Sequence, residues 1–335
     1  MPTKNGLDLN DKVILVTGGT GSFGNKFAEV VLRDWKPRKL IIFSRDEYKQ
    51  HEMARAFNSD SLRFFVGDVR DIDRLHRAMR GVDIVIHAAA MKQVPACEYN
   101  PFEAVKTNIV GAANLIDAAI DAGVKRVLAV SSDKAVNPVN LYGATKLCAE
   151  KLFAQGNYYS TAQGTRFACA RYGNVVGSRG SVIPLFAEQQ RTNGTVTVTD
   201  KRMTRFWLTL EQGVGFVLKC LAQMEGGEIF VPKIPSMRIM DLVRVVAPDC
   251  KVVFTGIRPG EKIHEVLISE EEARQAVELK DMFVIYSMND GTQINASKKG
   301  TLLPEGFRYT SDKNDSWLTE EQLRAMVQVP EAVEA

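Results

Sequence analysis

The stretch KVILVTGGTGSFG, residues 12–24, decides the fold. Its apolar run Lys12–Val16 predicts a buried strand, and Phe23–Leu32 after the glycines predicts a helix. Glycines 18, 21 and 24 allow a tight turn and close approach of a pyrophosphate, while the helix N-terminus supplies free N–H groups. A glycine-rich turn alone is weak evidence. The strand–turn–helix context favours a dinucleotide site over a purely structural turn.

The same alternation of strand and helix continues outward from this stretch. Further strands are expected at Lys39–Phe43, Leu62–Val66, Asp83–His87, Arg126–Val130 and Arg166–Ala170, and helices at Phe102–Ala122, Tyr142–Ala154 and Glu211–Leu221. Strands that are apolar throughout imply a sheet covered on both faces. Strict alternation predicts an α/β fold with a Rossmann-type, doubly wound parallel sheet.

The alternation of strands and helices ends after Tyr172, where glycine, proline and polar loops become frequent. We expect residues 1–175 to form an NADP-binding Rossmann domain, to which residues 208–225 return. Residues 176–207 and 226–335 are expected to form a smaller mixed α/β C-terminal substrate-binding domain. Ile229–Val231, Met240–Val246 and Lys251–Thr255 are its expected elements.

Composition excludes several classes of protein. The 335 residues carry 43 Lys and Arg against 40 Asp and Glu, a net charge of +3, which argues against a general nucleic-acid or membrane-surface binder. The five cysteines are scattered, with no Cys-x-x-Cys pair, so neither a disulfide framework nor a zinc site is expected. No apolar run reaches the roughly 18 residues of a membrane span, and the N-terminus lacks a signal peptide. We therefore expect a cytoplasmic protein without a bound metal.

The residue about 20 positions after the glycines distinguishes the two dinucleotides. A carboxylate there signals NAD, but this chain has Ser44 followed by Arg45, which favours the 2′-phosphate of NADP. Asp46 is close enough to be a ribose ligand, although we interpret it as the cap of the next helix, with Lys49 as added positive charge. The expected cofactor-binding residues are Gly18, Thr20, Gly21, Ser22, Phe23, Gly24, Ser44, Arg45, Lys49, Asp68, Val69, Ala88, Ala89, Lys92, Asn108, Tyr142 and Lys146.

Tyr142 and Lys146 are four residues apart, which places both on one face of a helix. A lysine ammonium beside a phenol lowers the pKa of the phenol, and the phenolate can take a hydroxyl proton while hydride leaves the same carbon. Tyr309 and Lys313 have the same spacing but lie in a polar tail, so we assign them to a solvated loop.

Ser132, Asp133 and Lys134 follow the strand that ends near Val130. Ser132 is placed to bond the hydroxyl that Tyr142 deprotonates. Asp133 and Lys134 form an acid–base pair beyond what hydride transfer needs. A surface ion pair is the alternative interpretation, but the carboxyl end of a central strand favours catalysis.

These motifs together resemble the extended short-chain dehydrogenase/reductase superfamily, in its nucleotide-sugar branch. Asp133-Lys134 stands where dTDP-glucose dehydratases carry Asp-Glu and looks like the UDP-N-acetylglucosamine 4,6-dehydratases, as do Met91–Pro101 and Asn137-Pro138. Membrane-anchored members that retain C5 configuration usually carry Met in place of Tyr142. The chain therefore resembles the soluble, C5-inverting branch of pseudaminic acid biosynthesis.

The resemblance implies a redox-neutral loss of water from UDP-N-acetylglucosamine. Lys134 would take the C5 proton and Asp133 would protonate the departing C6 hydroxyl, although the division of these roles stays open. It also implies a homo-oligomer, dimer or hexamer. The implied substrate-binding residues are Lys92, Asn174, Arg179, Ser181, Thr199, Arg205, Met237, Arg258 and Glu261.

Two other functions remain open at this point. A UDP-N-acetylhexosamine 4-epimerase shares the cofactor, Ser132, Tyr142 and Lys146, but needs no Asp133–Lys134 pair. A non-catalytic NADP-sensing regulator on the same fold commonly loses the Tyr or the Lys, and this chain keeps both.

Overall fold

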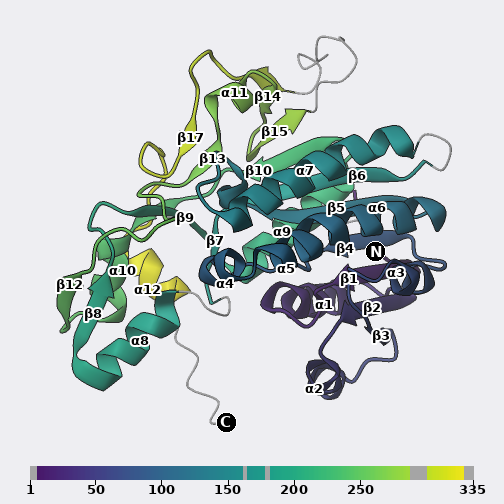
Figure 1. Cartoon of the computed structure of the whole chain (residues 1–335), viewed down its shortest axis with the longest axis horizontal. Coiled ribbons are helices and arrows are strands. Elements are labelled where there is room, and N and C mark those ends of the chain that lie inside the picture. The colour runs from purple at the N-terminus through teal and green to yellow at the C-terminus, as the bar shows by residue number, and fades with distance from the viewer. Residues whose placement is uncertain (1–5, 161–163, 178–181, 287–299, 328–335) are drawn as a thin grey trace.

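A ten-stranded sheet forms the centre of the structure, a computed structural model that describes residues 6–160, 164–177, 182–286 and 300–327 (Figure 1). Its strand order is β16-β14-β15-β10-β6-β5-β4-β1-β2-β3. The parallel strands are β1 (Val13–Thr17), β2 (Lys39–Ser44), β3 (Leu62–Val66), β4 (Ile84–His87), β5 (Arg126–Ser132), β6 (Arg166–Tyr172) and β10 (Glu228–Pro232). The antiparallel edge consists of β15 (Met282–Tyr286), β14 (Ala276–Glu278) and β16 (Thr301–Leu302).

Helices cover both faces of this sheet. On one face lie α3 (Ile72–Ala78), α6 (Gly111–Asp121) and α7 (Leu141–Tyr159), and on the other α1 (Ser22–Asp34), α2 (Glu47–Phe57) and α9 (Leu210–Gln223). Neighbouring residues of one strand point to opposite faces, so Leu15 packs into the first core and Ile14 into the second. Both are fully buried. The α/β, doubly wound architecture expected from the apolar strands is confirmed.

The single helix expected at Phe102–Ala122 is wrong in its middle. The chain forms α5 (Pro101–Val105), a π-helical turn at Lys106–Val110, and then α6. Within the turn, Asn108 is buried and its side chain bonds both backbone groups of Met91 and the hydroxyl of Thr145. The wider turn admits this polar side chain, a common reason for a π-bulge at a site.

A second group of elements has a core of its own. It contains α8 (Val182–Asn193), β8 (Thr195–Val198), α10 (Ile239–Val246), β12 (Lys251–Phe254) and α12 (Glu320–Met326), packed around residues such as Phe186, Trp207 and Leu242. A three-stranded sheet of β7 (Asn174–Val175), β9 (Thr204–Leu208) and β11 (Ser236–Arg238) lies between this lobe and the main body (Figure 1). The remaining elements are α4 (Val94–Tyr99), a 3-10 turn at Asp133–Ala135, β13 (Val266–Ile268), α11 (Glu270–Ala273) and β17 (Tyr309–Thr310).

Two expectations for the C-terminal half are wrong. Ile229–Val231 does not belong to the smaller domain, because β10 pairs with β6 inside the main sheet. Tyr309 is not in a solvated loop, because β17 pairs with β13 and the Tyr309 hydroxyl bonds both backbone groups of Ile234. Hydrophobic packing under the sheet edge, against Phe206 and Phe283, outweighs the polar composition of its neighbours.

A buried ionic network ties the main body together at Arg171. Its guanidinium, fully excluded from solvent, donates to both carboxylate oxygens of Glu150 on α7, at 2.9 and 2.6 Å, and of Glu272 on α11, at 2.9 and 2.7 Å. The two carboxylates oppose the desolvation of Arg171 and raise its pKa further above its ordinary range. One side chain of β6 thus joins the central helix to the C-terminal segment.

All five cysteines are free thiols. Among the described residues, no helix is long and apolar enough to cross a membrane, and no cluster of three His, Cys, Asp or Glu could hold a metal ion.

Candidate active site

A cavity of about 750 Å³ opens at the carboxyl ends of the parallel strands. Every expected cofactor-binding residue lines it except Gly24, which is buried within α1, and Asn108, whose side chain is used on Met91 and Thr145. The cavity therefore collects loops that lie far apart in the sequence, after β1, β2, β3, β4 and β5.

Close backbone packing forms the floor of this cavity. Gly18 has φ +65°, and a Cβ there would lie 2.9 Å from the backbone N and Cα of Ala89. The first loop can therefore sit directly against the end of β4. Helix α1 begins after Gly21, which makes no side-chain cap, so the helix end faces the cavity without a capping group of its own. A helix end of this kind can bind a pyrophosphate, and the glycine loop before it lines the same cavity, as in dinucleotide-binding folds.

Asp46 caps α2, as the sequence predicts, because its carboxylate accepts from the Lys49 backbone N–H at 3.0 Å. Its carboxylate also pairs with the Lys49 ammonium, so it is committed to the helix end. The Arg45 guanidinium is 64% exposed and lies 3.7 Å from Asp68. Asp68 accepts from the Arg70 guanidinium at 2.7 Å, and although burial opposes the shift, this bond lowers the pKa of Asp68.

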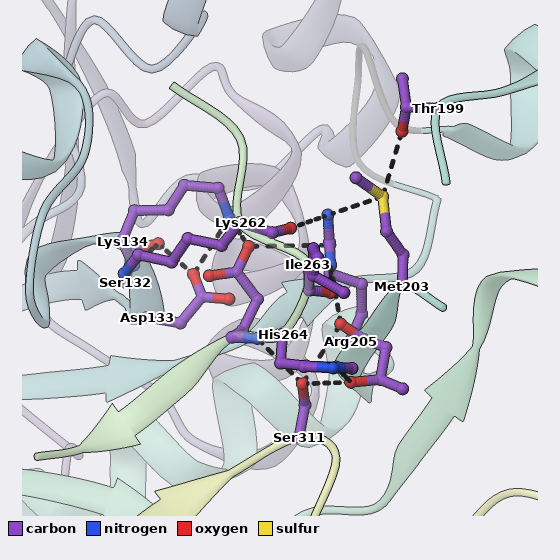
Figure 2. Close-up of polar contacts among 12 residues, drawn as sticks. Ser132, Asp133, Lys134, Thr199, Met203, Arg205, Lys262, Ile263, His264 and Ser311 are labelled. Atoms are coloured by element: carbon purple, nitrogen blue, oxygen red, sulfur yellow. Dashed lines mark hydrogen bonds and ion pairs between the residues drawn. The ribbon is translucent and has the colours of Figure 1, made fainter. Parts of the chain in front are cut away.

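Ser132, Asp133 and Lys134 form one hydrogen-bonded unit at the end of β5. Ser132 Oγ donates to Asp133 Oδ1 at 2.7 Å, and Lys134 Nζ donates to the same oxygen at 3.1 Å. Asp133 is fully buried, and its Oδ2 has no hydrogen-bond partner among the described residues. Ser132 and Lys134 line the cavity. Figure 2 shows Ser132, Asp133 and Lys134 beside Lys262, with Arg205, His264 and Ser311 on the other side of the contact network.

Tyr142 and Lys146 face the same cavity from the first two turns of α7. The Asn140 side chain caps this helix by accepting from the Gly143 N–H at 2.8 Å. The Lys146 ammonium donates to the Val130 carbonyl at 2.6 Å, and burial lowers its pKa. The juxtaposition expected from the four-residue spacing is therefore present.

The electrostatics of Tyr142 differ from expectation. Burial raises the pKa of Tyr142 to about 12, whereas the sequence predicts a lowered value. The positive charge that opposes this rise is that of Lys134, assisted by a hydrogen bond with Ser132. Lys146 is aimed at a backbone carbonyl instead. The acid–base unit after β5 and the phenol are thus electrostatically coupled.

Among the implied substrate-binding residues that the structure describes, two line the cavity. Lys92 and Asn174 line the cavity, and the buried side-chain oxygen of Asn174 has no partner among the described residues. Met237 is fully buried in the core of the second lobe, where packing against Trp207 explains it, and so it does not face the cavity. Arg179 and Ser181 lie outside the described residues. The others, none of which lines the cavity, are Thr199, Arg205, Arg258 and Glu261.

The loop that carries Arg258 and Glu261 nevertheless contacts the segment between Lys134 and Tyr142. Asn140 Nδ2 donates to the Gly260 carbonyl at 2.8 Å, and the Lys262 ammonium donates to the Val136 carbonyl. Arg205 holds the base of this loop through the carbonyls of Ile263, at 2.9 Å, and Lys262, at 3.1 Å. Sequence reasoning missed Glu265 just beyond it, a buried carboxylate near Lys134, because no motif marks it.

Comparison with known proteins agrees with this geometry. The model of a family described as polysaccharide biosynthesis protein matches residues 14–287. The chain belongs to this family. A UDP-N-acetylglucosamine 4,6-dehydratase (inverting) of Campylobacter jejuni is 51% identical, over 95% of this chain and 98% of the relative. A UDP-glucose 4-epimerase of Rickettsia conorii is 42% identical, over 86% of each.

A solved structure has the same fold as this chain. The X-ray structure of Pen from Bacillus thuringiensis is 40% identical, covers 96% of this chain and 98% of its own, and superposes with a TM-score of 0.87. The Rossmann-type architecture of this chain is therefore that of its extended short-chain dehydrogenase/reductase relatives.

Proposed function

We propose that this protein is a UDP-N-acetylglucosamine 4,6-dehydratase that inverts C5, a hydro-lyase. The observation that carries the proposal is the hydrogen-bonded unit Ser132–Asp133–Lys134, which faces the same cavity as Tyr142 and Lys146. The likeness to the inverting enzyme of Campylobacter jejuni supports it. The product is UDP-2-acetamido-2,6-dideoxy-beta-L-arabino-hex-4-ulose.

The reaction begins at the C4 hydroxyl of the sugar. The Tyr142 phenol first releases its own proton to solvent, and the phenolate then takes the C4 hydroxyl proton as the carbon is oxidised, while Ser132 orients the oxygen. The Lys134 ammonium supplies the positive charge that favours the phenolate, and Lys146 lines the same cavity from the next turn of α7. A nicotinamide dinucleotide held by the residues that line the cavity would supply the acceptor for the C4 hydride and the donor of a hydride to C6.

The Asp133–Lys134 pair then eliminates water. The two carboxylates near Lys134 outweigh its desolvation and raise the pKa of its ammonium above the ordinary range, so the resting pair is carboxylate and ammonium. One proton passing along the 3.1 Å contact from Nζ to Oδ1 gives a neutral amine and a carboxylic acid. The amine can take the C5 proton, which the new ketone acidifies, while the acid protonates the leaving C6 oxygen. The pair thus returns to its resting charges, and a solvent-derived proton that reaches C5 from the opposite face completes the product and inverts that carbon.

Incubating the purified protein with UDP-N-acetylglucosamine in D2O tests this function. We expect a 4-keto-6-deoxy product with L-arabino configuration and deuterium at C5, without net oxidation or reduction, by NMR and mass spectrometry. A D-xylo product from the earliest time points would keep the dehydratase but remove inversion. UDP-N-acetylgalactosamine formed without loss of water would establish the epimerase, which the 42% identity to a UDP-glucose 4-epimerase keeps as the second candidate.

We further infer that the dinucleotide is NADP, tightly bound and recycled. Ser44, Arg45 and Lys49 line the adenosine end of the cavity, and Asp46 is committed to capping α2 rather than to a ribose. Mass spectrometry of the nucleotide released from the purified protein tests this. NAD as the main species would overturn it, as would a variant Arg45→Ala with unchanged preference for NADP over NAD.

The cellular setting is part of the same proposal. We infer a cytoplasmic homo-oligomer, dimer or hexamer, that performs the first step of pseudaminic acid-type nonulosonate biosynthesis. Tyr99 and Phe102, on α4 and α5, are 87% and 79% exposed and support an association surface. Light scattering of the purified protein tests the oligomer, and a monomer at micromolar concentration contradicts it.

A further inference from the structure

Lys134 lies between two carboxylates, and only one of them belongs to the motif after β5. Asp133 Oδ1 is 3.1 Å from its ammonium, and Glu265 Oε1 is 3.7 Å away. The same oxygen of Glu265 is 3.6 Å from Arg205 Nε. The Glu265 side chain is 5% exposed, and its Oε2 has no hydrogen-bond partner among the described residues. An anion this buried needs the two cations beside it.

The backbone of Glu265 is fixed from the C-terminal side of the molecule. Its N–H donates to Ser311 Oγ at 2.9 Å, and its carbonyl accepts from the Ser311 N–H at 2.9 Å. Ser311 Oγ is in turn 2.6 Å from Thr204 Oγ1. The carboxylate is therefore held at a set position, one residue before β13, opposite the turn that carries Lys134.

We propose that Glu265 is a positioning residue of the dehydration step, a fixed negative charge that holds the Lys134 ammonium against Asp133. This inference rests on the proposed dehydratase function. The Asp133–Lys134 pair works with one shared proton, and it stops working when that proton is lost. When Lys134 has taken the C5 proton it is an ammonium again, and until Asp133 has given up its own proton the second carboxylate beside that ammonium is Glu265, which is also paired with Arg205.

The charge balance around Lys134 supports this role. An opposite charge within about 4–6 Å shifts a pKa by about 1–3 toward the charged form. Positive neighbours lower the pKa of Lys134. Burial in turn lowers the pKa of the two neighbouring lysines, Lys92 and Lys262. The titratable and charged groups that face Lys134 are Asp133, Glu265, Arg205, Tyr142, Lys92 and Lys262. Glu265 and Asp133 are the carboxylates of this set.

The experiment measures turnover of UDP-N-acetylglucosamine by wild type and Glu265→Gln from pH 7 to pH 10.5. The amide keeps the shape and removes the charge, so Lys134 loses its proton at lower pH. The ratio of kcat in the variant to kcat in the wild type should fall by at least about threefold across this range, because groups common to both proteins cancel. KM should stay within about twofold, because Glu265 does not line the cavity.

Two further variants complete the test. Glu278→Gln removes an exposed carboxylate paired with Lys233 and should give a constant ratio. Glu265→Asp keeps the charge, so the ratio of its kcat to that of the wild type should stay constant with pH, even if its kcat is lower. This variant still tests the inference if Glu265→Gln does not fold. A constant ratio for Glu265→Gln, or a falling ratio for Glu265→Asp, would overturn the inference. If the wild type loses no water, the proposed function fails instead.

Discussion

Tyr142 is the residue whose chemistry is easiest to isolate. Tyr142→Phe removes the hydroxyl and keeps the ring in its small cluster with Cys97 and Ala104. We expect turnover to fall by about 10²–10⁴-fold, the usual worth of a positioned acid–base group, with UDP-N-acetylglucosamine still bound. Steady-state kinetics and calorimetric binding measure the two effects.

The chain contains a matched control for this variant. Tyr309 has the same spacing to a lysine, but its hydroxyl bonds the backbone of Ile234. Tyr309→Phe should keep turnover and lower the free energy of unfolding by about 1 kcal/mol. Equal loss of turnover in both variants would contradict the assignment of Tyr142.

The environment of His87 predicts the direction in which the free energy of unfolding changes with pH. It is 3% exposed, lies 2.8 Å from Thr17 Oγ1, and burial lowers its pKa to about 3. Since the unfolded chain has the ordinary value of about 6.5, the unfolded state binds the proton first, and stability is lost as pH falls below 6.5. The contribution of His87 to the free energy of unfolding should fall by about 1.4 kcal/mol per pH unit.

Urea denaturation of wild type and His87→Gln between pH 7 and pH 4.5 measures this term. The difference between the two free energies of unfolding should be constant above pH 7 and change steadily below 6.5. A difference independent of pH would mean that the imidazole takes up its proton at the same pH in the folded and unfolded protein.

At the scale of elements, the first turn of α7 packs closely against the turn that carries Asp133 and Lys134. A Cβ on Gly143 would lie 2.2 Å from the Lys134 carbonyl oxygen and 3.0 Å from Pro138 Cβ. Gly143→Ala must therefore displace the turn that carries Asp133 and Lys134. We expect about 1–3 kcal/mol lower stability and at least about tenfold lower turnover. Thermal unfolding and steady-state kinetics measure these changes.

Gly215 provides the contrasting glycine. It lies on α9, and a Cβ there would meet nothing within 4 Å. Gly215→Ala should leave turnover unchanged and raise stability by about 0.5–1 kcal/mol, because alanine loses less backbone freedom in a helix. The assignment of strain to Gly143 is wrong if both variants lose turnover to the same degree.

The elements that sequence could predict are those with a strong apolar period. The strands of residues 13–132 and the helix after Tyr142 appear where the pattern places them, to within a few residues. The π-turn at Lys106–Val110 escapes prediction because its cause is a tertiary contact of Asn108. The placement of β10 and β17 likewise depends on partners far along the chain.

The candidate site shows the same division. Glycines, Ser132, Asp133, Lys134 and Tyr142 are found because local motifs carry them. Glu265 is missed because its role comes from the folding of the 265 and 311 segments onto the turn after β5. Met237, which the resemblance places among the substrate-binding residues, lies in the core of the second lobe, and that position depends on the fold rather than on local sequence.

At the scale of the whole molecule, stability depends on the ionic network of Arg171. Arg171→Ala leaves Glu150 buried without a guanidinium, and Glu272 loses the same partner. We expect a loss of about 3–5 kcal/mol in the free energy of unfolding, the usual cost of breaking a buried pair from one side. Lys233→Ala, which removes the half-buried partner of the exposed Glu278, should cost at most about 1 kcal/mol. Similar urea midpoints for both variants would show that the buried network contributes no more to the free energy of unfolding than a surface ion pair does.

The route of the chain through the main sheet constrains how the protein can be made. When a ribosome has released the first 175 residues, the β6 edge is complete but β10, β15 and β14 have not been synthesised. At that moment Arg171 has one of its two carboxylates, because Glu272 is still to come. The nascent N-terminal half therefore presents to solvent an open strand edge and an arginine that still lacks one of its two carboxylates. Its final folding must wait for synthesis of the C-terminal third, a window in which a chaperone that shields strand edges would raise the yield of active protein.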